Sequence, residues 1–305
     1  METLSQQILL MIISMPSSLV LTTATRFLTR AIGAAVAGIF AGLFFAGPTD
    51  AHEPSFNRTD NGLLIAAFSV WEPFVIEDED GSRHGIDVAL LTEIARRLGL
   101  ELDLHPCPWR RCLKTLEDGQ IDVLTSFAFT KERAEFAHYV TPPYSQVTPV
   151  FYYNRENPVS ITDYGDLRNL TIGAVVDSRY FEPFDSDTSL DKFEAGSEII
   201  LLRMLNAKRL DAIVGSDSNA DFEIRRDHLE DTIVKAPFRS GHHNDIHMAV
   251  SRKSPLMART EQISQIMQDL LDEGFIDRLH EQYWPDKGPS QHSRDDNPDA
   301  TQPIQ

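Results

Sequence analysis

The sequence predicts an α/β protein built from open sheets with helices on both faces. Short apolar runs, typical of buried strands, alternate along the chain with longer amphipathic segments, typical of helices. This alternation favours strands that are connected through helices packed on the sheet. The 305 residues are enough for two compact lobes, and the alternation starts afresh at Phe151.

The first unit follows a polar stretch at 52–61. Its expected strands are short apolar runs, and its expected helices are amphipathic. Asp87 is the expected cap of the first helix. In chain order the elements are a strand at 63–68, a helix at 87–98, a strand at 100–104, a helix at 109–116 and a strand at 121–127.

A second unit of the same kind follows, and the chain then returns to the first. Its expected elements begin at 151–153 and continue at 171–176, 197–205 and 211–214. The returning strand is expected at 246–250, and the last helices around 255–272 and 275–282. The tail at 285–305 is rich in Pro, Asp, Ser and Gln, so we expect it to be disordered.

The overall charge is strongly acidic, with a formal net charge of −18. No run of lysine and arginine offsets it, so we expect neither nucleic acid nor an anionic membrane surface as a partner. The hydrophobic and charged fractions, 42% and 24%, are those of a soluble globular protein.

Residues 1–51 have the pattern of a secretory signal peptide. Arg26 and Arg30 precede an uninterrupted run of small and apolar residues, and Ala51 offers a small residue for cleavage. We therefore expect export to the periplasm. The alternative is a membrane anchor, although the run is shorter than the roughly 20 residues that a span needs. No cysteine lies near the cleavage position, so a lipid-anchored form is not expected.

A hydroxyl-rich turn between the strand at 121–127 and the next helix has the composition of an anion clamp. The first N–H groups of a helix attract a carboxylate, and a guanidinium can bind it with two parallel hydrogen bonds. Ser126 or Thr130 supplies hydroxyl donors in this interpretation, and Arg133 supplies the guanidinium.

Several sequence blocks, in a fixed order, carry a resemblance to a known family. They are Trp71-Glu72-Pro73-Phe74, Gly85-Ile86-Asp87-Val88 with the helix that follows, Asp118-Gly119-Gln120-Ile121-Asp122, Thr130-Lys131-Glu132-Arg133-Ala134 with 139–144, 167–173, 206–215, and 273–276 with Tyr283-Trp284. Together, over about 63–284, they resemble the family 3 extracellular solute-binding proteins, the amino-acid-binding receptors of ATP-binding-cassette importers.

The resemblance implies a two-lobed periplasmic binding protein-like II fold, in which each lobe is a mixed sheet flanked by helices. Two crossings connect lobe one, 61–146 plus 245–284, to lobe two, 148–244. The ligand is expected between the lobes, at the carboxyl ends of the strands, with closure about a hinge.

The function that the resemblance implies is capture of a small zwitterion or carboxylate, an amino acid, for an ABC permease. The chain is then a monomer without cofactor, metal or enzymatic activity. One alternative is an enzyme on the same fold, similar to the periplasmic cyclohexadienyl dehydratases, with Glu72 or Asp217 as its general acid. Another is a stand-alone periplasmic sensor.

By the resemblance, Arg133 binds the ligand carboxylate and Ser126 contacts the ligand. The alternative for Arg133 is a surface residue paired with Glu132 or Asp122. Ala128 stands where many relatives have a second hydroxyl, which leaves the ligand class open.

Aromatic residues are the next candidates. Trp71 occupies the family's aromatic position on the cleft wall. Of Phe127 and Phe129, which alternate at a strand end, one is expected in the cleft and the other in the core. Trp109 and Arg110 lie where members of the family have a residue that contacts the ligand side chain.

Lobe two departs from the family pattern. Asp177-Ser178-Arg179 replaces the usual Gly-Thr-Thr; Ser178 and Arg179 remain carboxylate candidates, whereas Asp177 is expected to cap a helix or attract an amine. The family's ammonium-binding acid aligns with Ser216, and Asp217 is one residue later. Asp217 is therefore the candidate for the ligand ammonium.

The histidines and cysteines complete the candidates. His242, His243 and His247 could suggest a metal, but no acid or cysteine accompanies them at ligand spacing, so a surface loop is the expectation. Cys107 and Cys112 are expected to form a disulfide in the oxidising periplasm, with Cys107 in the turn before a helix that starts near Pro108; the alternative is two unpaired thiols.

Overall fold

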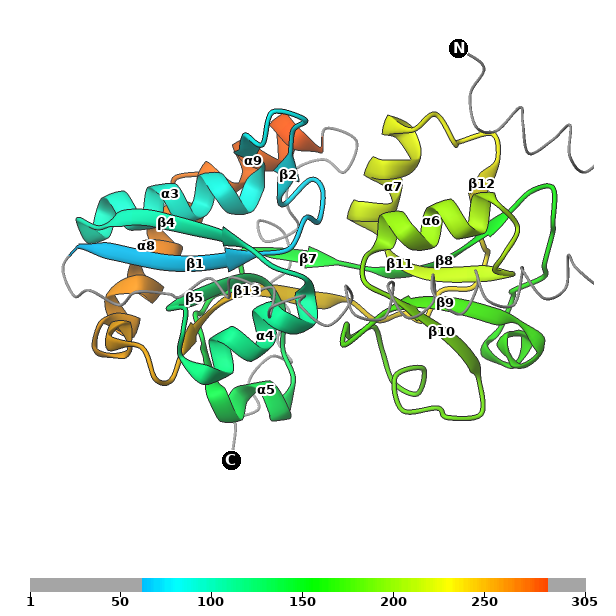
Figure 1. Cartoon of the computed structure of the whole chain (residues 1–305), viewed down its shortest axis with the longest axis horizontal. Coiled ribbons are helices and arrows are strands. Elements are labelled where there is room, and N and C mark those ends of the chain that lie inside the picture. Colours follow the sequence, from blue (N-terminus) through cyan, green and yellow to red (C-terminus); the bar gives the residue numbers. More distant parts are fainter. Residues whose placement is uncertain (1–61, 285–305) are drawn as a thin grey trace, which may run out of the picture. The chain divides into compact units, whose positions relative to one another are not determined.

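The computed structural model describes residues 62–284, and the expected signal peptide and C-terminal tail lie outside them. All described residues belong to one compact unit. Two large sheets divide this unit into two lobes (Figure 1). Among residues 62–284, no helix is both long and apolar enough to cross a membrane.

The sheet of lobe one is mixed. Its strand β1 (Leu63–Phe68) lies between β4 (Glu101–Pro106) and β5 (Val123–Ala128) and is parallel to both. The returning strand β13 (Asn244–Ser251) is antiparallel to β5 and extends the sheet. The shorter strands that pair with β13 are β6 (Ala137–Tyr139) and β7 (Ser145–Val147), and a separate hairpin joins β2 (Ile76–Glu77) to β3 (Arg83–His84).

Helices cover both faces of this sheet, as the unbroken apolar run of β1 predicts. Leu64 and Ala66 pack into the core that includes α3 (Ile86–Leu98), whereas Ile65 and Ala67 pack into the core that includes Cys112 of α4 (Trp109–Asp118). This alternation follows from the two-residue period of a strand. The remaining helical elements of the lobe are α5 (Lys131–Phe136), η2 (Pro255–Arg259), α8 (Thr260–Asp272) and α9 (Phe275–Tyr283).

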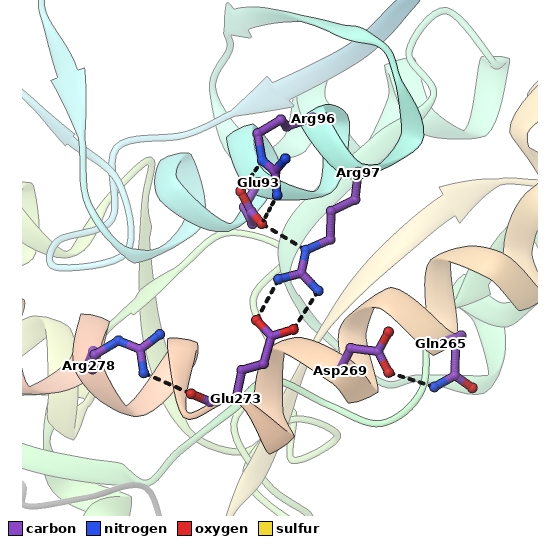
Figure 2. Close-up of polar contacts among 7 residues, drawn as sticks. All are labelled: Glu93, Arg96, Arg97, Gln265, Asp269, Glu273 and Arg278. Atoms are coloured by element: carbon purple, nitrogen blue, oxygen red, sulfur yellow. Dashed lines mark hydrogen bonds and ion pairs between the residues drawn. The ribbon is translucent and has the colours of Figure 1, made fainter.

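A surface network of ion pairs ties α3 to the end of α8 (Figure 2). Arg97 donates from Nε to Glu93 at 2.8 Å and from both Nη atoms to Glu273, at 3.0 and 2.6 Å. Arg96 makes two further bonds to Glu93, both of 2.7 Å. Hydrogen bonds from these two arginines lower the pKa of Glu93 to about 2, so the network is charged at neutral pH.

The sheet of lobe two has the strand order β10-β9-β11-β8-β12. The parallel strands are β10 (Asp191–Ala195), β9 (Thr171–Val175) and β11 (Ala212–Ser216), and the antiparallel partners are β8 (Pro149–Asn154) and β12 (Ile233–Lys235). Phe151 and Tyr152 of β8 pack into separate cores on opposite faces. The helices are η1 (Tyr164–Asn169), α6 (Glu198–Asn206) and α7 (Asp217–Arg226).

Two crossings connect the lobes. The chain leaves lobe one between β7 and β8 and returns between β12 and β13. At the junction β7 and β13 pair antiparallel, with Asn244 opposite Val147. The crossings therefore lie side by side, which is the geometry of a two-stranded hinge.

Two local expectations need correction. Helix α3 begins at Ile86 after Gly85, so Asp87 is not its cap. Gly85 has φ 118°, and a Cβ there would lie 2.5 Å from the carbonyl oxygen of Phe74, so only glycine fits this close approach. The segment at 255–272 is not one helix, because a 3₁₀ turn, η2, precedes α8.

The structure contains a disulfide between Cys107 and Cys112. Cys107 precedes α4 and Cys112 lies within it, with Pro108 at the N-cap and not at the first helical position. The bond therefore holds the start of α4, which carries Trp109 and Arg110, against the end of β4.

Candidate functional site

A cleft between the two lobes encloses about 820 Å³ of empty space, including its solvent-open mouth. Lobe one contributes the end of β1, the turn after it, and the segment from β5 to α5. Lobe two contributes the turn after β9, the start of α6 and the end of β11. In both lobes the lining residues thus follow the carboxyl ends of parallel strands, where open α/β sheets bind ligands.

Arg133 lies on the cleft wall and is 6% exposed. Its Nη1 donates to Ala128 O at 2.9 Å and its Nη2 to Asp177 O of lobe two at 2.7 Å. Its guanidinium lies over the rings of Trp109 and Phe127. Burial lowers the pKa of Arg133 to about 10, so the side chain stays charged at neutral pH. The two bonds use two of its five N–H donors.

Asp177 is the lobe-two partner of this wall. Its main-chain oxygen also accepts a hydrogen bond of 3.4 Å from Trp109 Nε1, and its carboxylate forms an ion pair of 2.5 Å with Arg110 Nε. Its φ of 58° places it in the left-handed region, and no helix starts after it. The expectation of a helix cap at Asp177 is therefore wrong.

Ser126 lines the cleft at the end of β5, with φ 55°. Its Oγ donates to Asp87 Oδ2 at 2.7 Å, and Tyr144 donates to Asp87 Oδ1 at the same distance. Burial raises the pKa of Asp87, which is fully enclosed by the lobe. Because the hydroxyl proton is directed at Asp87, Ser126 offers the cleft an acceptor in this arrangement. Thr130, the other hydroxyl of the expected clamp, instead caps α5 by accepting from Arg133 N.

Glu198 is a cleft residue that the sequence reasoning missed. It opens α6, lines the cleft and is 4% exposed. Its Oε1 accepts from Ser216 N at 2.5 Å, and its Oε2 from Trp71 Nε1 at 2.8 Å. Burial raises its pKa to about 7, against these two hydrogen bonds, which lower it. An acid at the start of a helix is ordinarily a surface residue that complements the helix dipole, so no local sequence pattern indicates that Glu198 is buried.

Trp71 reaches Glu198 because its own turn is rigid. The indole stacks on Phe74 with ring centroids 4.6 Å apart, and Trp71 exchanges main-chain hydrogen bonds with Val75. Trp71 therefore stands on the cleft wall, as its position in the sequence predicts, and its N–H reaches across to the other lobe.

The other candidates divide into two groups. Trp109, Ser178 and Arg179 line the cleft. Phe127 does not, because it is fully buried in the core beside α4. Phe129 is 53% exposed and is also outside the lining, so one of the pair lies in the core as expected but neither lies in the cleft.

Arg110 and Asp217 are also absent from the lining. Arg110 is held by Asp177 at the exposed edge of α4. Asp217 Oδ1 accepts from the main-chain N–H groups of Thr148 and Ser218, both at 2.9 Å. Asp217 thus fastens the first crossing to α7, and its carboxylate does not occupy the position expected for a ligand partner.

Of the three histidines, His242 and His243 lie in the exposed segment before β13, as expected, whereas His247 is buried on β13 and is not part of a surface loop. His243 Nδ1 lies 3.0 Å from Thr148 Oγ1, and His247 Nδ1 lies 3.0 Å from Val140 O. Within residues 62–284, no group of three or more His, Cys, Asp and Glu side chains is arranged to hold a metal ion.

Comparison with known proteins identifies the fold and the family. The family model described as bacterial extracellular solute-binding proteins, family 3, matches residues 63–286, most of the chain. The chain belongs to this family. A relative among characterised proteins is the probable amino-acid-binding protein YxeM of Bacillus subtilis, 22% identical over 75% of this chain and 86% of YxeM.

Solved structures of other proteins share the fold. AbpA, an amino acid ABC transporter substrate-binding protein from Streptococcus pneumoniae, solved with L-arginine bound, has a TM-score of 0.65 at 20% identity, over 73% of this chain and 95% of AbpA. The ancestral amino acid-binding protein AncCDT-1, a precursor of cyclohexadienyl dehydratase, has a TM-score of 0.63 at 17% identity, over 73% of this chain and 96% of its own. At these identities the likeness concerns the fold alone.

Proposed function

We propose that the chain is a periplasmic receptor that binds an amino acid between its lobes for an ABC-type permease. The observation that carries the proposal is the pairing of opposite charges in one cleft. Arg133 and Arg179 stand on its wall with Glu198. A zwitterion offers one partner to each sign of charge, and a partly buried cleft strengthens both interactions.

The roles follow from the donors and acceptors. We assign the ligand carboxylate to Arg133, with Ser178 and Arg179 as further donors from lobe two. We assign the ligand ammonium to Glu198 and to the acceptor lone pairs of Ser126. Ser216, at the family's usual acid position, donates its main-chain N–H to Glu198 and thereby orients the acid. Trp71 and Trp109 then cover the ligand from lobe one.

The relatives support this assignment of ligand class and partner. YxeM is named as a probable amino-acid-binding protein, and AbpA serves an amino acid ABC transporter. We propose a binding role without catalysis or cofactor, as a monomer that docks on a permease. The lobes in this proposal are 61–146 plus 245–284 and 148–244.

A thermal-shift screen of the twenty amino acids and small carboxylates, followed by calorimetry, tests the proposal. A ligand at a hundred times its dissociation constant stabilises a protein by about 2.7 kcal/mol. We expect at least one amino acid to produce such a shift. If none does while small carboxylates without an amine do, the zwitterion assignment is wrong.

A second candidate function, a dehydratase, is favoured by one observation. Glu198 is a buried acid whose pKa lies near 7, a value suited to a general acid at neutral pH. Chromatography of prephenate or arogenate incubated with the protein separates the two functions. If the wild-type protein forms product and Glu198→Gln does not, the protein is an enzyme, and the proposal that it only binds its ligand is wrong.

Export is part of the proposal and has its own test. Arg26, Arg30, the apolar run and Ala51 predict a mature chain that begins near His52. Mass spectrometry of the periplasmic fraction should give that N-terminus. An intact N-terminus in the membrane fraction would mean that the segment is an anchor.

A further inference from the structure

A second cavity, of about 730 Å³ including its open side, adjoins the cleft. The two share four lining residues, Phe68, Ser69, Val70 and Ser197. Because Ser197 immediately precedes Glu198, the second cavity begins beside the acid to which the ligand ammonium is assigned. A ligand seated in the cleft can therefore extend its side chain into this space.

Glu223 is the residue of interest in the second cavity. It is on α7, which packs beside α6 (Figure 1), and it is 4% exposed. Its Oε1 accepts a hydrogen bond of 3.1 Å from Asn219 Nδ2. Its Oε2 is buried and has no hydrogen-bond partner among the described residues. A buried carboxylate oxygen without a partner is costly, and a cation supplied by a ligand removes that cost.

Two neighbouring oxygens share this condition. Asn219 Oδ1 and Ser218 Oγ are also buried without a partner in the described part of the chain. Asn219 directs its amide to Glu223 and to the main-chain oxygen of Glu72, at 2.6 Å, so its Oδ1 remains as an acceptor. Asn219 Oδ1 can only accept, Ser218 Oγ can accept or donate, and Glu223 Oε2 is an acceptor when the carboxyl is ionised.

Nearby cations are already paired elsewhere. Among the described residues that line the second cavity, Glu77 and Glu223 are acidic and none is basic. Arg226, one turn from Glu223 on α7, forms its ion pairs with Glu72 and Asp227. Arg83 pairs with Glu77 at 3.0 Å at the exposed edge. Glu223 therefore lines the cavity as an acid that forms no ion pair with any described residue.

We propose that the second cavity is the subsite for a positively charged side-chain end and that Glu223 is its counter-ion, so that the ligand is a cationic amino acid. This inference rests on the proposed function, because it takes the amino-acid end to lie between Arg133 and Glu198. Glu223 is then the residue that separates cationic from neutral side chains.

Proton release gives the subsite a second signature. Burial raises the pKa of Glu223 to about 8, and the charges of Glu198 and Glu72 act in the same direction, against Asn219 and Arg226. At pH 7 the carboxyl therefore holds its proton in the absence of ligand. A cation at Oε2 favours the carboxylate, so binding of a cationic ligand releases a proton from Glu223 and binding of its neutral analogue does not.

The test is calorimetry of the wild-type protein with two ligand pairs that differ in charge: L-arginine with L-citrulline, and L-lysine with L-norleucine. In at least one pair we expect the cationic member to bind about 30-fold or more tightly than the neutral one, because it meets a buried acid. Titration in buffers of different ionisation enthalpy should show a larger proton release for that member.

The variant Glu223→Gln keeps the shape and removes the charge. We expect the ratio of affinities within the pair to fall to about threefold or less, with the neutral member bound as before. Its unchanged affinity also shows that the cleft is intact. Glu230→Gln, an exposed acid after α7 in the same lobe, is the matched control and should keep the wild-type ratio.

Three results would overturn the inference. If neutral amino acids bind the wild-type protein as tightly as cationic ones, the subsite is wrong but the proposed function stands. A ratio that survives in Glu223→Gln would remove Glu223 from the subsite. A wild-type protein that binds no amino acid of either kind would remove both the subsite and the function on which it rests.

Discussion

Trp71 Nε1 donates a hydrogen bond of 2.8 Å to Glu198 Oε2, which lies 127 residues later in the chain and in the other lobe. The same carboxylate accepts from Ser216 N at the end of β11. A second contact across the lobes runs from Asn219 Nδ2 to Glu72 O at 2.6 Å. The turn at 71–72 of lobe one thus touches α6 and α7 of lobe two, and its contacts favour the closed arrangement.

Replacing Trp71 by Phe tests this contact. The variant retains a ring against Phe74 but leaves Glu198 Oε2 without its donor, which we expect to weaken ligand binding by about 1.5–3 kcal/mol. Calorimetry of the parent and variant measures the loss. Trp109→Phe is the matched control, because its N–H bond to a neutral carbonyl is longer, 3.4 Å, and its loss should be smaller. Equal affinities in both variants and the parent would show that the Trp71 bond does not support closure.

Much of the fold could be predicted from the sequence because local patterns determine it. The apolar run at Leu63–Phe68 predicted a strand in a sheet with helices on both faces, and it became an interior strand of a sheet with a core on each side. Most of the expected strands and helices have bounds within a few residues of those observed, but α8 begins at Thr260 after a 3₁₀ turn, and β10, α7 and β12 were not expected. Asp87 is not the cap of α3, because the helix begins directly after Gly85. Gly85 packs closely against the carbonyl of Phe74, and a contact between residues this far apart in the sequence does not follow from the local pattern.

The site was less predictable, because it depends on which side chains meet across the lobes. Trp71, Ser126 and Arg133 reach the cleft from positions that local motifs indicate. Glu198 does not follow from any such pattern, since only the approach of Trp71 and Ser216 converts a helix-start acid into a buried cleft residue. Asp217 was expected as the acid, but the fold uses its carboxylate to hold the main chain at Thr148.

Arg133→Ala should abolish measurable binding of the ligand that the screen identifies. Removing the guanidinium leaves the ligand carboxylate buried without its partner, a loss of about 2–5 kcal/mol. Arg133→Lys should recover little, because an ammonium cannot reproduce the two parallel donors. Lys131→Ala, an exposed cation on the same short helix, is the control. If folded Arg133→Ala binds within about threefold of the parent, a change of roughly 0.65 kcal/mol, Arg133 does not bind the ligand.

The disulfide gives a prediction about stability. Cys107 and Cys112 close a small ring, and in the chain-entropy model its loss lowers the free energy of unfolding by about 2 kcal/mol. We expect the double variant Cys107→Ser with Cys112→Ser to show this loss in urea unfolding. Thiol labelling of the unfolded, unreduced parent should find no free cysteine. Two labelled thiols in that experiment would mean that the bond does not form in the exported protein.

The buried acids of the cleft predict that the ligand-free protein loses stability as pH rises. The pKa of Glu223 is about 8 in the folded chain against an ordinary value of 4.5, and that of Glu198 is about 7. Between pH 5 and pH 8 the folded state therefore holds more protons than the unfolded state, and its stability falls as pH increases, by up to about 1.4 kcal/mol per pH unit for each proton.

Glu223→Gln isolates the larger of these two contributions. The amide cannot ionise, so the free energy of unfolding of the variant should decline less with pH, and its advantage over the parent should grow from pH 5 to pH 8. Urea unfolding at pH 5, 6.5 and 8 without ligand measures the difference. Glu93→Gln is the contrasting control: the pKa of Glu93 is about 2, so its ion pairs are fully formed across this window and their loss should be the same at all three pH values. If the free energies of unfolding of the parent and of Glu223→Gln change in parallel with pH, Glu223 is ionised from pH 5 to pH 8. Another group, and not a bound proton, then offsets the cost of burying its carboxylate.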